Sequence, residues 1–124
     1  MSIVRFNEDH EWVRRDGDEA VVGITDYAQT QLGEVVHVDL PPVGKRIEQG
    51  KEVAAVESVK VSNAINAPIS GEVTVINAAL TADPAKINAD PMGEGWFFKL
   101  RVTDTTEFDA LLDEAAYRKF VDSL

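Results

Sequence analysis

The stretch Glu57-Ser58-Val59-Lys60 lies between two segments that have the pattern of β-strands. The apolar run Val53-Ala54-Ala55-Val56 precedes it, and the apolar positions alternate again from Ile65 to Ile69. Runs of this length and composition are typical of strands. The sequence therefore predicts an exposed β-hairpin near residues 53–69, with Lys60 at its tip.

The two valines beside the lysine suggest how it is displayed. Because successive side chains of an extended chain point to opposite faces, we expect Val59 and Val61 to face inward as anchors and Lys60 to point outward. Most surface lysines only solubilise a protein, although the amine is also a common target of modification. Whether Lys60 has a special role therefore has to be judged from the residues around it.

Length and composition indicate one globular domain spanning residues 1–124. Hydrophobic residues make up 44% of the chain and charged residues 27%, both ordinary values for a globular protein. The chain has no cysteine. Disulfides and protein thiol chemistry are therefore excluded, and any sulfur redox chemistry must come from an attached group.

The chain is strongly acidic, with 12 basic and 22 acidic residues and a net charge of −10. Such a surface repels phosphate backbones, which argues against nucleic-acid binding. It either steers the protein toward basic partner surfaces or serves solubility alone. No apolar run reaches membrane-spanning length, and the segment from Met1 to Phe6 has no signal or transit pattern. We therefore expect a cytoplasmic or already processed protein without membrane contact.

The first third of the chain predicts a hairpin followed by a short helix. Asp16-Gly17 separates two strand-like stretches, His10–Arg14 and Glu19–Ile24, and is a typical tight-turn pair. Thr25 is a suitable N-cap for a helix over Asp26–Gln31.

Later segments predict more strands and a final helix. Val36, Val38 and Leu40 form the apolar face of a half-buried strand, whereas residues 87–91 have an irregular pattern. A strong strand follows a glycine turn, with one face made of Trp96, Phe98, Leu100 and Val102. We expect Trp96 and Phe98 to be core residues. Helical spacing of apolar residues over 106–121 predicts an amphipathic C-terminal helix, which starts at Thr106.

A conventional active site cannot be assembled from this sequence. His10 and His37 are the only histidines, and without cysteine the spacing of a zinc site is absent. Gly93-Glu94-Gly95 is too short to hold a phosphate, and no lysine-serine pair follows it. The absence of a catalytic set favours a carrier over an enzyme.

Three motifs carry a resemblance to a known family. Glu57-Ser58-Val59-Lys60, the segment Ala67–Val73 and Gly93-Glu94-Gly95-Trp96 resemble the glycine cleavage system H protein family. The wider stretch from Val43-Gly44 to Gly71 looks like a lipoyl/biotinyl swinging-arm domain. The resemblance implies a mainly β fold, a barrel-sandwich hybrid of two small antiparallel sheets with short helices, a C-terminal helix and the lysine on an exposed hairpin.

The resemblance also implies a function. The chain would be a carrier, not an enzyme, with lipoate attached covalently to Lys60. It would shuttle the aminomethyl group of glycine between a pyridoxal-phosphate glycine decarboxylase, a tetrahydrofolate-dependent aminomethyltransferase and dihydrolipoyl dehydrogenase. A lipoate ligase or transferase would attach the cofactor. The implied location is the cytoplasm of a bacterium, or the mitochondrial matrix for a processed eukaryotic chain.

The residues around the lysine are implied to act in recognition and arm contact. Glu57, together with Ser58 and Val59, would help the ligase or a partner to dock, although Glu57 could equally be a solvated strand carboxylate. The family pattern implies a cleft with two acids that hold the ammonium of the loaded arm. Glu11 matches the first acid, whereas the second position is Ala64, a departure from the pattern.

Three alternatives stay open from the sequence. A biotin carrier would share the fold, but its lysine normally lies between two methionines. A lipoyl domain of a 2-oxo acid dehydrogenase usually shows Asp-Lys-Ala at this place. An H-like binding module whose lysine is never modified would keep the motifs without the cofactor.

Overall fold

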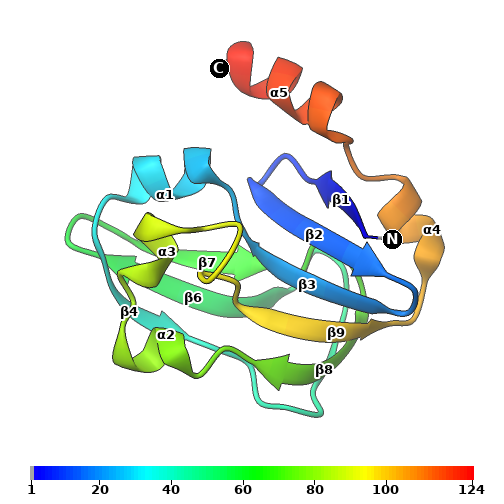
Figure 1. Cartoon of the computed structure of the whole chain (residues 1–124), viewed down its shortest axis with the longest axis horizontal. Coiled ribbons are helices and arrows are strands. Elements are labelled where there is room, and N and C mark those ends of the chain that lie inside the picture. Colours follow the sequence, from blue (N-terminus) through cyan, green and yellow to red (C-terminus); the bar gives the residue numbers. More distant parts are fainter. Residues whose placement is uncertain (1) are drawn as a thin grey trace.

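The computed structural model describes residues 2–124, so Met1 of the predicted domain lies outside the described residues. Its strands form two antiparallel sheets (Figure 1), one six-stranded with the order β1-β2-β3-β9-β8-β5 and one three-stranded with the order β4-β6-β7. The strands are β1 (Ile3–Phe6), β2 (Glu11–Asp16), β3 (Glu19–Ile24), β4 (Val35–Asp39), β5 (Arg46–Ile47), β6 (Glu52–Ser58), β7 (Ser62–Asn66), β8 (Gly71–Ile76) and β9 (Phe98–Val102). The mainly β fold of two antiparallel sheets with short helices is confirmed.

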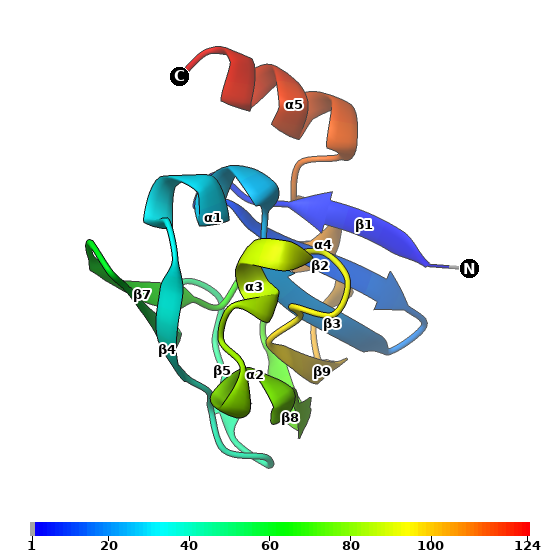
Figure 2. The same cartoon turned by 60° about the vertical axis from the view of Figure 1, so that its left-hand side comes forward.

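Short helices cover the edges and ends of the sheets (Figure 2). They are α1 (Asp26–Leu32), α2 (Ala79–Ala82), α3 (Lys86–Ala89), α4 (Thr105–Asp109) and α5 (Glu114–Asp122). The predicted N-cap is confirmed, because the hydroxyl of Thr25 accepts a hydrogen bond from the backbone N–H of Ala28 at the start of α1. Within residues 2–124, no helix combines the length and apolar character needed to cross a bilayer.

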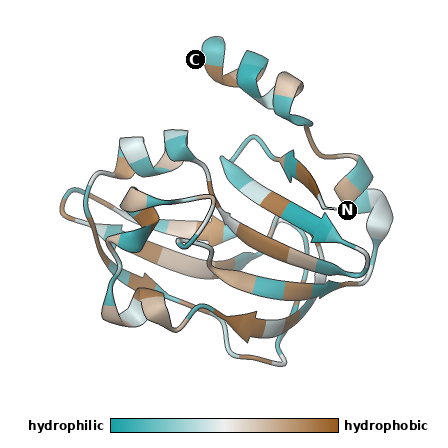
Figure 3. Ribbon diagram, viewed as in Figure 1, coloured by the Kyte–Doolittle hydropathy of each residue, from teal (hydrophilic) through white to brown (hydrophobic). Residues whose placement is uncertain are grey.

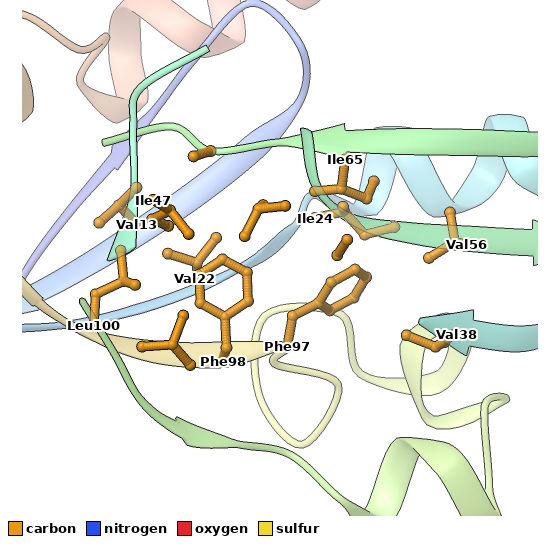
Figure 4. Packing of buried hydrophobic residues seen from close by; sticks show 14 of the residues in the cluster. Val13, Val22, Ile24, Val38, Ile47, Val56, Ile65, Phe97, Phe98 and Leu100 are labelled. Carbon is orange, nitrogen blue, oxygen red and sulfur yellow. The ribbon is translucent and has the colours of Figure 1, made fainter. Parts of the chain in front are cut away.

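The main core lies between the two sheets, where apolar side chains from both meet (Figure 4). Apolar and polar residues alternate along several strands, as the hydropathy colouring shows (Figure 3). Phe98 is fully buried, as predicted, but so is its neighbour Phe97. Phe97 precedes β9, and its N–H donates to the carbonyl of Val22 at 2.8 Å. The strict strand alternation therefore does not extend back to Phe97.

Trp96 differs from the prediction, because it is only partly buried at a second cluster built around Trp12 and Tyr117. The ammonium of Lys99 lies 5.3 Å from the centre of its ring. Such a cation–π contact suits an aromatic ring that remains accessible at one face. Trp96 is therefore a boundary residue rather than part of the main core.

The predicted apolar face of β4 is also wrong in one position. Val36 is 45% exposed, whereas Val35 and Val38 are buried. The pairing between β4 and β6 shifts between Val35 and His37, which marks a β-bulge or irregularity. A bulge adds a residue to one strand and so changes which side chains reach the core.

The predicted single helix over 106–121 is in fact two helices, α4 and α5. Each begins at an aspartate N-cap, Asp104 or Asp113, whose side chain accepts a hydrogen bond from a backbone N–H of the first turn. Between the helices, Leu112 exchanges two backbone hydrogen bonds with Phe6, each 2.8 Å long. The helix is interrupted because this segment pairs with β1 instead.

Neither β1 nor α3 was predicted. β1 pairs with β2 along the sheet edge and buries Phe6. The irregular segment predicted over 87–91 contains most of α3, which begins just after Asp83-Pro84 and buries Ile87 completely. Pro84 lies just before the N-cap residue Ala85, so it does not interrupt the helix that follows.

Candidate functional site

Lys60 lies in the turn that joins β6 to β7, as predicted, and this hairpin projects at the left edge of Figure 1. The side chain of Ser58 organises the turn. Its hydroxyl oxygen accepts hydrogen bonds from the N–H groups of Lys60 at 3.2 Å and Val61 at 3.1 Å. The N–H of Ser58 donates to the carbonyl of Val61 at 2.8 Å. A serine hydroxyl that bonds its own turn in this way restricts the backbone beneath the lysine.

The two valines are not anchors. Val59 is 65% exposed and Val61 is 45% exposed, which contradicts the expectation that both face inward. Strand alternation does not apply to them because the extended conformation of β6 ends at Ser58. The buried residue of the turn is Ser58 itself, which was predicted only as a recognition residue.

The turn rests on the loop that follows α1. The N–H of Val59 donates to the carbonyl of Glu34 at 3.0 Å. Asn88 of α3 holds this loop by donating to the carbonyl of Gly33 at 2.7 Å and accepting from the N–H of Val35 at 2.9 Å. Sequence analysis did not identify Gly33 or Asn88 as parts of the site, because their contacts join segments far apart in the chain.

Glu57 is exposed, three residues before the lysine. In the small sheet it is paired with Ser62 of β7 on one side and His37 of β4 on the other. A docking residue and a solvated carboxylate would both be exposed at this place on the hairpin.

A cleft of about 470 Å³ lies beside the hairpin. This volume is within the range of small-ligand sites. Val61 and the β7 segment form one wall, α1 forms another, and the turn between β1 and β2 completes it. Its lining residues are Asp9, His10, Glu11, Ile24, Tyr27, Ala28, Gln31, Leu32, Val61, Asn63, Ala64, Ile65 and Asn66.

Glu11 is the buried acid of this cleft, with only 2% of its surface exposed. One carboxylate oxygen accepts from the side-chain amide of Asn7 at 2.7 Å, and the other accepts from the N–H of Asn66 at 3.2 Å. Burial raises the pKa of Glu11 to about 7, and the charge of Asp9 adds to the rise, while the bonds from Asn7 and Asn66 oppose it. A proton or a cation is therefore favoured at this carboxyl group near neutral pH.

The turn before Glu11 is held by the same asparagine. The side-chain oxygen of Asn7 accepts from the N–H groups of Asp9 at 3.1 Å and Glu11 at 2.9 Å. His10, between them, has a φ of 66°, a left-handed conformation that is uncommon outside glycine. Sequence analysis missed Asn7, although an asparagine side chain that accepts from the backbone N–H two residues on is a recognised turn signal.

Ala64, at the position where the resemblance implies a second acid, lines the same cleft as Glu11. It contributes a methyl group at the wall. Asp9 also lines the cleft and brings a second carboxylate to it. The cleft thus combines apolar walls with acidic groups near one turn.

Comparisons with known proteins all give one family. The family model described as "Glycine cleavage H-protein" matches residues 4–124. Among curated relatives, the glycine cleavage system H protein of Parvibaculum lavamentivorans is 56% identical over all of this chain and 99% of its own length. That of Methylocella silvestris is 52% identical over the same shares. A crystal structure of a glycine cleavage system H protein from Mycobacterium marinum has a TM-score of 0.85 and 34% identity, covering 98% of this chain and 97% of that one.

Glycine cleavage H proteins carry covalently attached lipoate and are carriers, not enzymes. They work with glycine decarboxylase, aminomethyltransferase and dihydrolipoyl dehydrogenase in glycine breakdown. The match covers nearly the whole chain and exceeds half identity with a curated relative. The chain belongs to the glycine cleavage H-protein family.

Proposed function

We propose that Lys60 is the residue to which lipoate is attached, and that the cleft beside it shelters the aminomethyl cargo. The single observation that carries this proposal is the Ser58-braced turn, which displays an exposed lysine next to a cleft with a buried acid. An arm fixed at such a tip reaches partner active sites at high effective concentration.

The residues present suit the cofactor. When bound, lipoate supplies the disulfide and dithiol chemistry that a chain without cysteine lacks. Lys60 offers an exposed amine for the amide bond. The side chains of Ile24, Leu32 and Ile65 form an apolar wall of the cleft. Asp9 places negative charge at the cleft, and Glu11 adds a second carboxylate when a cationic cargo takes the place of its proton.

We further propose that Glu57, Ser58 and Val59 are read by the lipoate ligase or transferase. Glu57 and Val59 are exposed on the hairpin, and Ser58 sets the shape of the turn. Residues 1–124 would act as one lipoyl-carrier domain. The cytoplasm is the proposed location, because the curated relatives named above are bacterial.

Intact mass and peptide mapping after expression with lipoate and a ligase test the attachment site. Wild type and Lys51→Arg should both gain one lipoyl group, whereas Lys60→Arg should gain none. Lipoate on Lys45 or Lys51 in the wild type would refute the assignment. A biotin mass would support a carrier of another complex, and no added mass would support a binding module.

The role of Glu57 needs its own experiment. Glu57→Ala should slow lipoylation without changing the thermal midpoint, and added salt should reduce the difference because exposed charges are screened. Slowing that is equal at low and high ionic strength would contradict an electrostatic role. Glu52→Ala, an exposed acid at the far end of β6, is the matched control.

A further inference from the structure

The C-terminal helix α5 reaches the cleft through one hydrogen-bonded chain. α5 lies above β1 and α1 in both views, away from the main core (Figures 1 and 2). Its buried residue Tyr117 places its hydroxyl 2.7 Å from the hydroxyl of Thr25 and 2.8 Å from Nδ1 of His10. His10 in turn lines the cleft.

The available donors and acceptors decide the direction of the hydrogen bonds between Thr25, Tyr117 and His10. The hydroxyl oxygen of Thr25 accepts from the N–H of Ala28 at 3.3 Å, and Thr25 is buried, so its own proton needs an acceptor. Tyr117 is the acceptor within reach, and its own proton then goes to Nδ1 of His10. This arrangement uses every donor once and leaves the imidazole proton on Nε2.

His10 is also fixed from its other sides. Its ring centre lies 4.5 Å from that of Tyr27 on α1 and 5.8 Å from that of Phe120 on α5. Its backbone carbonyl accepts from the N–H of Thr25 at 2.9 Å, and its own N–H donates to the carbonyl of Asn7. The ring therefore sits between two helices and the turn that carries Asp9 and Glu11.

We propose that Tyr117 is a positioning residue of the cleft, whose hydroxyl, oriented by Thr25, donates to Nδ1 of His10 and holds the imidazole uncharged against the cargo space. This inference rests on the proposed function, in which the cleft shelters a cationic cargo. An imidazolium in the wall would repel that cation and would compete for Asp9 and Glu11. The C-terminal helix thus sets the charge balance of a site to which it adds no lining residue.

The surroundings of His10 shift its pKa in opposite directions. Burial lowers the pKa of His10, and the charge of Asp9 opposes this fall. Glu11 lines the same cleft, and the phenols of Tyr27 and Tyr117 face the ring from α1 and α5. Protonation of Nδ1 would make the imidazole a donor to the Tyr117 oxygen, and the phenol proton would lose its acceptor. Geometry and burial therefore favour the same neutral form.

Nitrogen-15 NMR of the two histidines tests this directly, because His37 on β4 serves as an internal reference. Wild-type His10 should carry its proton on Nε2, with Nδ1 showing the shift of a hydrogen-bond acceptor. Tyr117→Phe should abolish that acceptor shift, and the released ring should titrate at higher pH, nearer the ordinary histidine value of about 6.5. Tyr27→Phe is the matched control, because it removes a phenol that touches the same ring without a hydrogen bond among residues 2–124.

Two results would overturn the proposal. One is a proton on Nδ1 of wild-type His10, and the other is an unchanged His10 spectrum in Tyr117→Phe. Retention of the aminomethyl cargo, measured without transferase at pH 6, should fall several-fold in Tyr117→Phe relative to wild type. If Lys60 is not lipoylated, the NMR result still decides the hydrogen bond, so failure of the two proposals can be told apart. Changed NMR with unchanged retention would overturn the link to the cargo.

Discussion

The side chain of Lys60 lies across Gly33. A Cβ atom placed on Gly33 would be 3.1 Å from Cε of the lysine and 3.7 Å from its Nζ. Gly33 ends α1 with a φ of 78°, a conformation that favours glycine. At the C-terminal end of α1, Gly33 therefore turns the backbone and also leaves room for the aliphatic part of the Lys60 side chain.

Gly33→Ala should disturb the lysine as well as the backbone. The strained conformation should lower stability by about 1–3 kcal/mol, and the new methyl group should push the lysine stem away. We expect slower lipoylation, measured by intact mass against time. Gly50→Ala is the control, because Gly50 has a φ of 87° and open space around its Cβ position. Equal lipoylation rates in the two variants would contradict the contact.

Glu11→Gln should change how stability depends on pH. Because folding raises the pKa of Glu11 from 4.5 to about 7, the folded state binds more protons between these values. The wild type therefore loses stability as pH rises through this range. The glutamine variant has no such group, so its stability relative to wild type should improve by about 1–3 kcal/mol from pH 4.5 to pH 8. Urea unfolding at several pH values measures this, and parallel curves would refute it.

Ala64→Asp should hold the cargo longer. Position 64 lines the cleft with Glu11, so a new carboxylate adds attraction for an ammonium group. A partly exposed ion pair contributes about 0–1 kcal/mol, which corresponds to a few-fold longer lifetime of the aminomethyl cargo. Thr74→Asp on β8, outside the cleft, adds the same charge as a control. An unchanged lifetime with normal lipoylation would mean that position 64 does not meet the arm.

The two aromatic residues near β9 should differ in their contribution to stability. Phe98→Ala removes a fully buried ring and should cost about 3–5 kcal/mol of unfolding free energy. Trp96 is only partly buried, so Trp96→Ala should cost distinctly less and leave a folded carrier. Denaturant unfolding compares the two, and equal losses would place Trp96 in the core after all.

Local pattern was sufficient for much of the fold. The two strand-like stretches on either side of the Asp16-Gly17 turn correctly predicted β2 and β3, and Thr25 correctly predicted the start of α1. These features depend on neighbours within a few residues, where side-chain period and capping chemistry dominate. For the same reason the lysine hairpin, with its tip at Lys60, could be placed from sequence.

Only the tertiary structure decided the parts that depend on distant partners. The break between α4 and α5 follows from pairing of Leu112 with Phe6, and the exposure of Val36 follows from a shifted strand register. The local sequence favours a helix and a regular strand at these places, but hydrogen bonds to remote segments override that preference.

The cleft also combines features that the sequence determines with features that only the tertiary structure decides. The sequence by itself determined that the chain displays a lysine, lacks thiols and carries an acid at Glu11. Tertiary structure decided that Glu11 is buried against Asn66 and that Tyr117 reaches His10, 107 residues away. Burial and pairing set the charge of a group, and both depend on which segments fold against it, because a short stretch of sequence does not contain its own surroundings.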